Sequence, residues 1–569
     1  MSQQTIYTES NNCQDCYKCI RECPVKAIRI KDNKASVVPE LCIFCGHCTS
    51  VCPVGAKKVR EDLSYVRMLA NSDYDVVMSL APSFFSEFPG IAPARLIEAI
   101  KGLGIKAVEF TANAAEVLNV EIDNYLLEQK PCIAISQCCP SVVQLINKYF
   151  SQNNSDILHL LTPMLAHGKI LKEKYGKQVK VIFAGPCISK KNEADRHPGL
   201  IDGVITFKRL KEWLEDEGLF PEESSEDQTP VNAPEGLVYP VEGGMLKGLK
   251  NRKAAVDYDY MSFSGLEQVK DVLRGLDNWE PERPVFLELL ACAGGCINGP
   301  GSSCKNSVIH KRSDILQYYH THKNEKQRAK AIGLDQKLYT EDAVKNRDHS
   351  ALEIQQALER IDKHGFRDEL NCGGCGYATC RDFASAMIED RAESEMCVSY
   401  MRNVAHDKAS LLLQKMPYGV VIVDEHMKIM ESNEHFARLL GEEISIAFEC
   451  DPGLEGADMQ KLFPEHGFFS SLLSSGNESM EKDLRLGDKL VHLSLFTIQP
   501  KKLVCGIFQN MKQPEVQKEE IVRRTRKVIK ENLKTVQEIA FLLGENASNT
   551  ETMLNSIVES FHGEKQGHE

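Results

Sequence analysis

Cysteine spacing is the feature that most constrains this chain. Residues 13–23 and 42–52 each follow the pattern C-x2-C-x2-C-x3-C, and a proline follows the last cysteine of each run. This spacing lets three thiolates hold one face of an iron–sulfur cubane while the fourth crosses to a neighbouring cluster. Zinc is the alternative, but zinc sites rarely place a third cysteine so close or repeat the run with a proline. The segment is therefore predicted to bind two 4Fe–4S clusters.

The crossing of the fourth cysteine defines two predicted ligand sets. The first set is Cys13, Cys16, Cys19 and Cys52, and the second is Cys23, Cys42, Cys45 and Cys48. This arrangement resembles the module of bacterial ferredoxins. The resemblance implies that residues 1–60 exchange electrons with a ferredoxin-type or other electron-carrier protein.

Length and charge narrow the possible partners. A chain of 569 residues predicts roughly three to five domains. Its net charge of −13 argues against nucleic acid or an anionic membrane as the main partner. No signal peptide precedes the first cysteines, and no apolar run reaches the roughly 18 residues of a membrane span. We therefore expect a cytoplasmic protein whose 21 cysteines stay reduced and available to metal.

From about residue 75 the pattern becomes α/β. Apolar runs at 75–81, 132–137 and 179–185 predict buried strands separated by helices. Four cysteines far apart in sequence each follow a predicted strand, where α/β folds place ligands. They either converge on one cluster or are scattered buried thiols. They are Cys139, Cys187, Cys292 and Cys296.

The segments SQCCPSVV, GPCISKKNE and ELLACAGGCINGPGS resemble, in this order, the H-cluster motifs of iron-only (FeFe) hydrogenases. The resemblance spans roughly residues 75–312 and implies that the four cysteines hold a 4Fe–4S cluster. Cys296 would bridge to a two-iron subcluster with CO and cyanide ligands, where protons and electrons combine to dihydrogen. The resemblance also implies that Lys190 contacts a cyanide and that Cys138 relays protons. The alternative for Lys190 and Glu193 is a surface ion pair.

The chain departs from this family pattern at three positions. Gly185 and Leu290 stand where catalytic members usually have methionine, and Gln137 replaces a small residue. Because those methionines pack around the two-iron unit, the resemblance implies a reshaped pocket and slow turnover. The family's proton-path glutamates have no clear counterpart, and we expect Glu116 and Glu121 to be exposed helical residues.

A fourth group follows the pattern C-x2-C-x4-C-x16-C. It comprises Cys372, Cys375, Cys380 and Cys397, with glycines at 373, 374 and 376 that let the backbone fold tightly. The pattern resembles a small 4Fe–4S domain of electron-transfer proteins, with zinc as the alternative. The thiols outside all groups, Cys132, Cys304, Cys450 and Cys505, are expected to be buried small hydrophobic residues.

Residues 408–512 resemble a PAS domain, chiefly through MPYGVVIVDEHMKIMESNEHFARLLG. The segment predicts a strand, a turn at Asp424–Glu425, a second strand and a helix over EHFARLLGEE. The alternative is a generic α/β dimerisation module, and His492 is expected to be structural rather than a haem ligand. Apolar steps of three and four predict a helix over 515–545, followed by a last capped helix, for dimerisation or signal transmission.

These segments predict a multidomain α+β and α/β protein. The predicted domains are a ferredoxin-like 2x4Fe–4S module at 1–60, an H-cluster domain at 75–312, a helical connector at 313–365, a 4Fe–4S domain at 366–402, a PAS-like domain at 408–512 and C-terminal helices at 515–569. The expected cofactors are three 4Fe–4S clusters and an H-cluster, which joins a 4Fe–4S cluster to a 2Fe subcluster.

The favoured functional hypothesis is a hydrogen or redox sensor with slow H2 chemistry that signals through the PAS domain. Its partner would be a protein such as a phosphatase or kinase, and a homodimer through the PAS domain or the C-terminal helices is expected. The alternative is a catalytic hydrogenase subunit that exchanges electrons between ferredoxin-type carriers and H2. A weaker alternative is an electron-carrying subunit with a degenerate active site.

Overall fold

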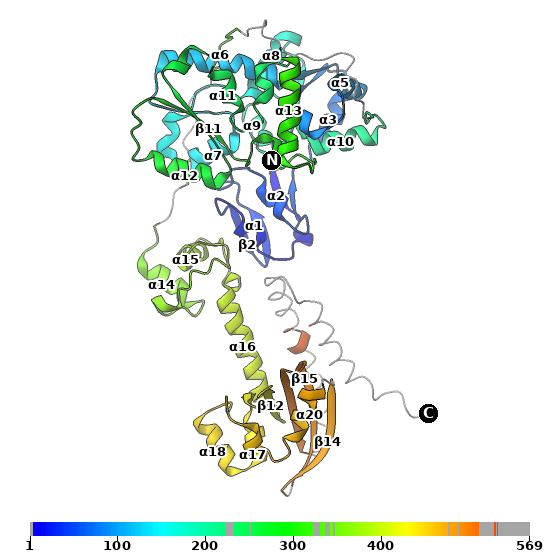
Figure 1. Ribbon diagram of the computed structural model, residues 1–569, viewed down its shortest axis with the longest axis vertical. Helices are drawn as coiled ribbons and strands as arrows, with labels where there is room; N and C mark the ends of the chain where they lie inside the picture. The colour runs from blue at the N-terminus through cyan, green and yellow to red at the C-terminus, as the bar shows by residue number, and fades with distance from the viewer. Residues whose placement is uncertain are drawn as a thin grey trace. The chain divides into compact units, whose positions relative to one another are not determined.

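The chain divides into two compact units, residues 1–393 and 394–569, in the computed structural model (Figure 1). The structure describes residues 4–222, 233–250, 252–323, 330–335, 342–344, 348–475, 478–487, 489–510, 528–530 and 532. The boundary between the units lies between Cys380 and Cys397, inside the segment predicted to form the small iron–sulfur domain.

Two short sheets and two short helices form the ferredoxin-like module. β1 (Ile6–Thr8) pairs antiparallel with β4 (Lys57–Val59), and β2 (Ile28–Lys31) pairs antiparallel with β3 (Lys34–Val37). Asp32 and Asn33 join the second pair with φ angles of +50° and +55°, as a two-residue hairpin turn requires. The helices are α1 (Lys18–Arg21) and α2 (His47–Val51).

The central domain contains two parallel sheets, with strand orders β6-β5-β8-β9 and β10-β11-β7. The strands are β5 (Val76–Leu80), β6 (Ala107–Phe110), β7 (Ile133–Ile135), β8 (Lys180–Gly185), β9 (Gly203–Thr206), β10 (Asp259–Ser264) and β11 (Val285–Leu290). The three strands predicted from apolar runs are β5, β7 and β8, so the α/β prediction is confirmed. Continuous apolar runs suit strands of parallel sheets, which helices cover.

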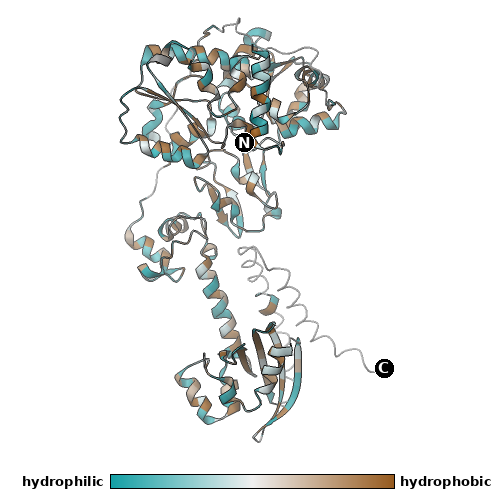
Figure 2. Cartoon of the chain, viewed as in Figure 1, coloured by the Kyte–Doolittle hydropathy of each residue, from teal (hydrophilic) through white to brown (hydrophobic). Residues whose placement is uncertain are grey.

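Amphipathic helices lie around these sheets (Figure 1), with teal and brown residues side by side along each helix (Figure 2). They are α3 (Leu63–Ala70), α4 (Phe84–Glu87), α5 (Pro93–Gly102), α6 (Thr111–Gln129), α7 (Pro140–Tyr149), α8 (Pro163–Tyr175), α9 (Ser189–Arg196), α10 (Phe207–Asp216), α11 (Gly244–Leu249), α12 (Leu266–Leu276) and α13 (Val308–His322). α12 shows the pattern, because it buries Val269, Leu273 and Leu276 on one face. In the described parts of the chain, no helix has both the length and the apolar character that a membrane crossing requires.

The first unit ends with two further helices and the third cysteine motif. α14 (Ala351–Glu359) begins with a capping box between Ser350 and Glu353, and α15 (Cys380–Ile388) begins with one between Thr379 and Asp382. The described part of the predicted connector is therefore helical at both ends.

The second unit begins with the long helix α16 (Val398–Lys415), which leads into one antiparallel sheet (Figure 1). The strands are β12 (Gly419–Asp424), β13 (Ile429–Ser432), β14 (Ser479–Leu486), β15 (Lys489–Gln499) and β16 (Leu503–Asn510). Their order is β13-β12-β16-β15-β14, and helices α17 to α20 lie in sequence between β13 and β14. The second unit thus combines an antiparallel sheet with short helices, the α+β composition predicted for this segment.

The predicted turn and helix of this domain are confirmed with one change. The Asp424 carboxylate accepts hydrogen bonds from the N–H groups of His426 and Lys428 at 2.9 and 2.8 Å, which closes the turn. The predicted helix is interrupted at Gly441, whose φ of +127° ends α17 (Glu434–Leu440) before α18 (Glu442–Cys450). The remaining helices are α19 (Met459–Leu462) and α20 (Gly467–Ser475). The helices predicted at 515–569 lie outside the described residues, except for 528–530 and 532.

The prediction that the four ungrouped thiols are buried is wrong for two of them. Cys132 and Cys450 are exposed, whereas Cys505 is buried and Cys304 is partly buried. Cys132 lies in the loop between α6 and β7, and Cys450 ends α18, a helix that buries none of its residues. Neither exposed thiol has a core to pack into.

A buried polar chain crosses the core of the first unit. The Ser79 hydroxyl on β5 lies 2.7 Å from Nδ1 of His167 on α8 and 2.7 Å from the Thr111 hydroxyl on α6. His167 is fully buried, and its Nε2 has no hydrogen-bond partner among the described residues. Burial lowers the pKa of His167 to about 4, so the ring is neutral in the folded protein.

This ring makes the stability of the first unit depend on pH. Its pKa in the folded chain lies below the ordinary 6.5, so the unfolded chain binds more protons and stability is lost as pH falls from 6.5 toward 4. Between pH 6.5 and 4 the protonation of His167 should lower the free energy of unfolding by up to roughly 3 kcal/mol. His167→Gln should remove this pH-dependent loss. Urea unfolding followed by tryptophan fluorescence measures it, because both tryptophans, Trp213 and Trp279, lie in this unit.

The matched control is His364→Gln, which changes an exposed histidine of the same unit. This control should keep the original pH dependence. An unchanged pH dependence in His167→Gln would show that His167 is not the group responsible.

Candidate functional site

The four thiols of the first predicted set line one small cavity in the ferredoxin-like module. Cys13, Cys16, Cys19 and Cys52 face this cavity, together with Tyr17, Pro53 and Lys57. Burial raises the pKa of the Cys19 thiol to about 11, the buried Lys57 ammonium opposes that rise, and the other three thiols add to it. The structure therefore brings the first set together around a single space.

Cys23 joins the second run rather than its own. The pKa of Cys42 is raised to about 11 and that of Cys48 to about 12, mainly by burial, and the Cys23 thiol contributes to both shifts. The pKa of Cys45 lies well above its usual value, first because of burial and then because of the thiols around it, Cys23 among them. The structure thus brings the second predicted set together, with the fourth cysteine crossed between the runs.

These donor sets fit iron–sulfur clusters. Buried thiols with such high pKa values keep their protons, and a metal that binds them as thiolates releases those protons. Three thiols already accept backbone N–H groups: Cys23 from Ala27 at 3.3 Å, Cys42 from Phe44 at 3.3 Å and Cys52 from Ala56 at 3.2 Å. Such bonds stabilise the charge of a ligated thiolate. Within the described ranges, no three His, Cys, Asp or Glu side chains are grouped as a single metal ion would require.

The four dispersed cysteines meet at the carboxyl ends of strands from both parallel sheets. Cys139 follows β7, Cys187 follows β8, and Cys292 and Cys296 follow β11. The pKa of Cys292 lies well above its usual value, mainly because of burial, and the other three thiols raise it further. Burial and the Cys139 thiol raise the pKa of Cys187 to about 11. We call this group the strand-end site.

The second ferredoxin-type set lies against the strand-end site. The Cys45 thiol is one of the groups that raise the pKa of Cys292. A side chain on Gly46, whose φ is +77°, would come within 2.5 Å of Ile188 Cδ1 and 2.8 Å of Pro300 Cγ. Glycine permits this approach, so the loop that carries Cys45 packs directly on the loops after β8 and β11.

A buried lysine on α7 fixes this docking. The Lys148 ammonium donates to the carbonyls of Pro39, Glu40 and Cys42 at 3.1, 2.6 and 3.1 Å. Burial lowers the pKa of Lys148, and without these acceptors a buried ammonium would be costly. Because α7 begins directly after Cys139, one helix joins the strand-end site to the ferredoxin-like module.

Lys190 is buried, so the alternative of a surface ion pair is wrong. Its ammonium pairs with the Glu193 carboxylate at 2.7 Å and donates to Thr162 Oγ1 at 3.1 Å. Burial opposes the charge, but Glu193 outweighs burial and the pKa of Lys190 is raised. Burial raises the pKa of the Cys138 thiol to about 12, with Lys190 lowering it and Glu288 raising it. A neutral thiol thus lies near a buried cation.

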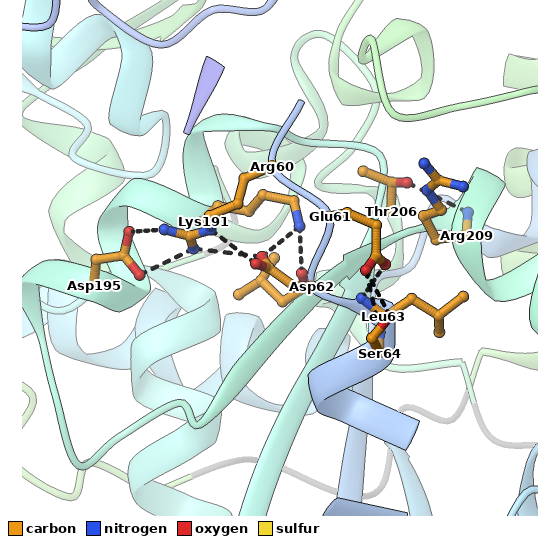
Figure 3. A network of polar contacts seen from close by, with 10 residues as sticks. Arg60, Glu61, Asp62, Leu63, Ser64, Lys191, Asp195, Thr206 and Arg209 are labelled. Atoms are coloured by element: carbon orange, nitrogen blue, oxygen red, sulfur yellow. Dashed lines mark hydrogen bonds and ion pairs between the residues drawn. The ribbon is translucent and has the colours of Figure 1, made fainter. Parts of the chain in front are cut away.

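Lys191 anchors the helix that carries Lys190. Its ammonium pairs with Asp62 at 2.5 Å and donates to the Val204 carbonyl at 2.7 Å. Arg60 also binds Asp62, at 2.8 Å, and reaches Asp195 on α9 at 2.7 Å (Figure 3). This network ties α9 to the segment that leaves the ferredoxin-like module.

The structure shows what surrounds the three residues that depart from the family pattern. A side chain on Gly185 would meet Phe183 Cε1 at 2.7 Å, so the Phe183 ring occupies that space. Leu290 is buried. Gln137 is also buried and donates to the Leu161 carbonyl at 3.1 Å, while its Oε1 has no partner among the described residues. These positions therefore hold a glycine packed against Phe183, a buried leucine and a buried glutamine whose Oε1 lacks a partner among the described residues.

Glu116 and Glu121 both lie on α6. Both are partly buried rather than exposed, and Glu121 accepts the N–H groups of Ile332 and Gly333 at 2.7 Å. The acids with the largest influence on the pKa of Cys138 are Glu288 and Glu193.

Sequence reasoning gave no role to three groups near the strand-end site. Glu288 is 2% exposed and accepts the Gly243 N–H at 2.7 Å and the Ser262 hydroxyl at 2.5 Å. Ser83 and Ser189 are buried hydroxyls that lack a partner among the described residues. All three lie near the carboxyl ends of parallel strands. Their place in the sequence close to these strand ends could have indicated them as site residues.

The third motif contributes three thiols to the first unit and one to the second. Cys372 is exposed, Cys375 and Cys380 are partly buried, and Cys397 is buried at the start of α16. Gly373 and Gly376 have φ angles of +71° and +94°, as the predicted tight backbone requires.

Comparison with known proteins identifies three parts of the chain. Residues 74–300 match the iron only hydrogenase large subunit, C-terminal domain, residues 5–53 match a 4Fe-4S dicluster domain, and residues 368–399 match a putative Fe-S cluster family. The chain is therefore a multidomain iron–sulfur protein. Its central domain is similar to the C-terminal domain of iron-only (FeFe) hydrogenase large subunits.

The relatives found are distant. The NADP-reducing hydrogenase subunit HndD of Solidesulfovibrio fructosivorans is 24% identical over 55% of this chain and 67% of its own length. Iron hydrogenase 1 of Clostridium pasteurianum is 23% identical over 46% of this chain, which spans only 56% of that relative. An FeFe-hydrogenase structure from Chlamydomonas reinhardtii has a TM-score of 0.36 at 18% identity and covers 47% of this chain and 91% of its own.

The crossed ligand sets predict which cysteine substitutions remove the same cluster. Cys52→Ala and Cys16→Ala should lose the same cluster and leave the same EPR spectrum in the reduced, reconstituted chain. Cys23→Ala and Cys45→Ala should share a different residual spectrum. Each change should remove about four iron atoms per chain, whereas Cys304→Ala should remove none. If Cys52→Ala matched Cys45→Ala instead, the crossing would be wrong.

Proposed function

We propose that this chain is a FeFe-hydrogenase-like sensor of dihydrogen or redox state, with slow H2 chemistry, that signals through its PAS-like domain. The observation that carries the proposal is that Gly185, where catalytic members usually have methionine, packs against the Phe183 ring in a chain that also carries a PAS-like sheet. A sensor must bind its signal, but it does not need fast turnover. The signal would then pass to a partner such as a phosphatase or kinase.

The strand-end thiols would hold the cofactor. Cys139, Cys187, Cys292 and Cys296 would bind the 4Fe–4S part of an H-cluster, with Cys296 as the bridge to the 2Fe subcluster. When bound, this group would supply the site where protons and electrons combine to dihydrogen. The buried Lys190 cation would neutralise an anionic ligand there, and the unpartnered hydroxyls of Ser83 and Ser189 are available as donors. The ferredoxin-like thiol sets would bring electrons to it.

Proton exchange at the site would use Cys138 and Glu288. With a pKa of about 12, Cys138 holds its proton at Sγ. Glu288 is a nearby acid whose pKa burial raises, which makes protonation easier than at an ordinary carboxylate. The Ser262 hydroxyl and the Gly243 N–H donate to this carboxyl and hold it in place. This route differs from that of the family's usual glutamates.

A catalytic hydrogenase subunit is the second candidate. The observation that favours it is the intact group of Cys138, Lys190 and Glu193, with the buried ion pair at 2.7 Å. This group serves turnover as well as sensing.

Infrared spectroscopy of the anaerobically matured chain tests the common part of both functions. Bands from CO and cyanide ligands should appear, because the four thiols and Lys190 provide a site for the 2Fe subcluster. Cys296→Ala should abolish the bands and Cys304→Ala should keep them. A matured chain without such bands would exclude the H-cluster.

Hydrogen–deuterium exchange of the same sample separates sensor from catalyst. A sensor should change the amide protection of α16 and the PAS-like sheet under H2 relative to N2, and Cys296→Ala should cancel the change. Unchanged protection in residues 398–510, combined with turnover as fast as that of efficient hydrogenases, would favour the catalytic subunit.

Glu288→Gln tests the proton route. An amide cannot take up a proton, so the rate of H2/D2 exchange should fall on the order of 10²-fold, with altered pH dependence. The infrared bands should remain. Ser262→Ala removes one hydrogen bond but keeps the acid, so it should retain most of the rate. Equal losses in both variants would assign Glu288 a structural role instead.

A further inference from the structure

The third cysteine motif packs against the ferredoxin-like module within the first unit. A side chain on Gly376, whose φ is +94°, would come within 3.1 Å of the Arg21 backbone nitrogen and 3.2 Å of its Cα. Gly376 directly follows Cys375, and Arg21 lies two residues before Cys23. The backbone segments that carry one thiol of each site therefore touch.

One backbone–backbone hydrogen bond and two bonds from backbone N–H groups to a carboxylate extend this contact. The Ile30 N–H on β2 donates to the Arg391 carbonyl at 3.1 Å. The N–H groups of Asp32 and Asn33 in the hairpin turn donate to the Glu393 carboxylate at 2.7 and 3.3 Å. Three hydrogen bonds that use backbone groups of the hairpin restrict the separation of the two segments. The motif is thus docked on the β2–β3 hairpin.

One cation is shared by the two sites. The Lys26 ammonium donates to the carbonyls of Ile20 and Arg21 at 3.1 and 2.9 Å, which holds it at the end of α1. Burial lowers the pKa of Lys26, and the thiols of Cys23 and Cys375 both oppose that effect. A positive charge in this place favours an added electron at either site.

We propose that the second ferredoxin-type site is a branch point for electrons. The loop of Cys45 packs on the strand-end site at Gly46, and the segment of Cys23 meets the third motif where Arg21 contacts Gly376. One electron would leave the site of Cys23 as it arrives at the site of Cys375, with no bond formed or broken and no proton needed. The inference rests on the proposed function and deepens it, because the third motif ends at Cys397, directly before α16.

The shared cation gives the first test, made on the full reconstituted chain. Lys26→Met should lower the reduction potentials of two clusters, that of Cys23 and that of Cys375, in an EPR-monitored titration. We expect a three- to tenfold change in each one-electron equilibrium constant, about 30–59 mV. Lys18→Met, which changes an exposed lysine on α1, should leave both potentials unchanged. A shift in only one potential, or in neither, would overturn the branch point.

The close backbone contact gives the second test. A reduced cluster at the third motif should speed the electron-spin relaxation of the Cys23 cluster, and Cys380→Ala should remove that effect. Gly376→Ala should weaken the effect, because its new Cβ meets Arg21. Gly373→Ala is the matched control, with φ +71° and its nearest neighbour at 3.9 Å.

Iron analysis must show that both glycine variants keep their clusters. No relaxation effect in the unaltered chain, or no iron at the third motif, would refute the branch point. The infrared bands of the H-cluster do not depend on this contact. Failure of the branch point is therefore distinguishable from failure of the proposed function.

Discussion

The Lys148 ammonium has exchanged water for three carbonyls of the ferredoxin-like module, and the arrangement of the first unit depends on that exchange. A buried ammonium is stable only while such acceptors stay in place. Because Lys148 lies on the helix that begins after Cys139, the same bonds set the position of the second ferredoxin-type set against the strand-end site. The backbone approach at Gly46 then follows, since no side chain fits between the two loops.

A lysine accompanies every well-defined thiol set of the first unit. Lys57 lowers the pKa of Cys19, Lys190 lowers the pKa of Cys187, and the thiols of Cys23 and Cys375 raise the pKa of Lys26. Ligated thiolates carry negative charge into a poorly solvated interior, and a nearby cation offsets part of the cost. The chain has net charge −13, yet these cations are placed near the thiols. Local charge placement, rather than overall charge, is what suits this chain to hold several anionic groups.

The cysteine sets and the parallel strands could be predicted because both follow from short-range rules of spacing and apolar runs. The crossing of Cys23 into the second set also follows from such a rule. The contents of the pocket could not be predicted, because the Phe183 ring beside Gly185 and the hydrogen bonds of Glu288 depend on packing between distant segments. The break at Gly441 was missed because a glycine ends a helix only when its φ becomes positive, which tertiary structure decides.

The two exposed thiols outside all cysteine groups give the chain an experimental handle. Cys132 lies in the first unit and Cys450 in the second, and both are open to solvent. Once the grouped thiols are committed to clusters, these two are the most accessible sites for a thiol-reactive probe. The natural sequence thus carries one attachment point on each unit, so the distance between the units is measurable by spectroscopy without any engineered cysteine.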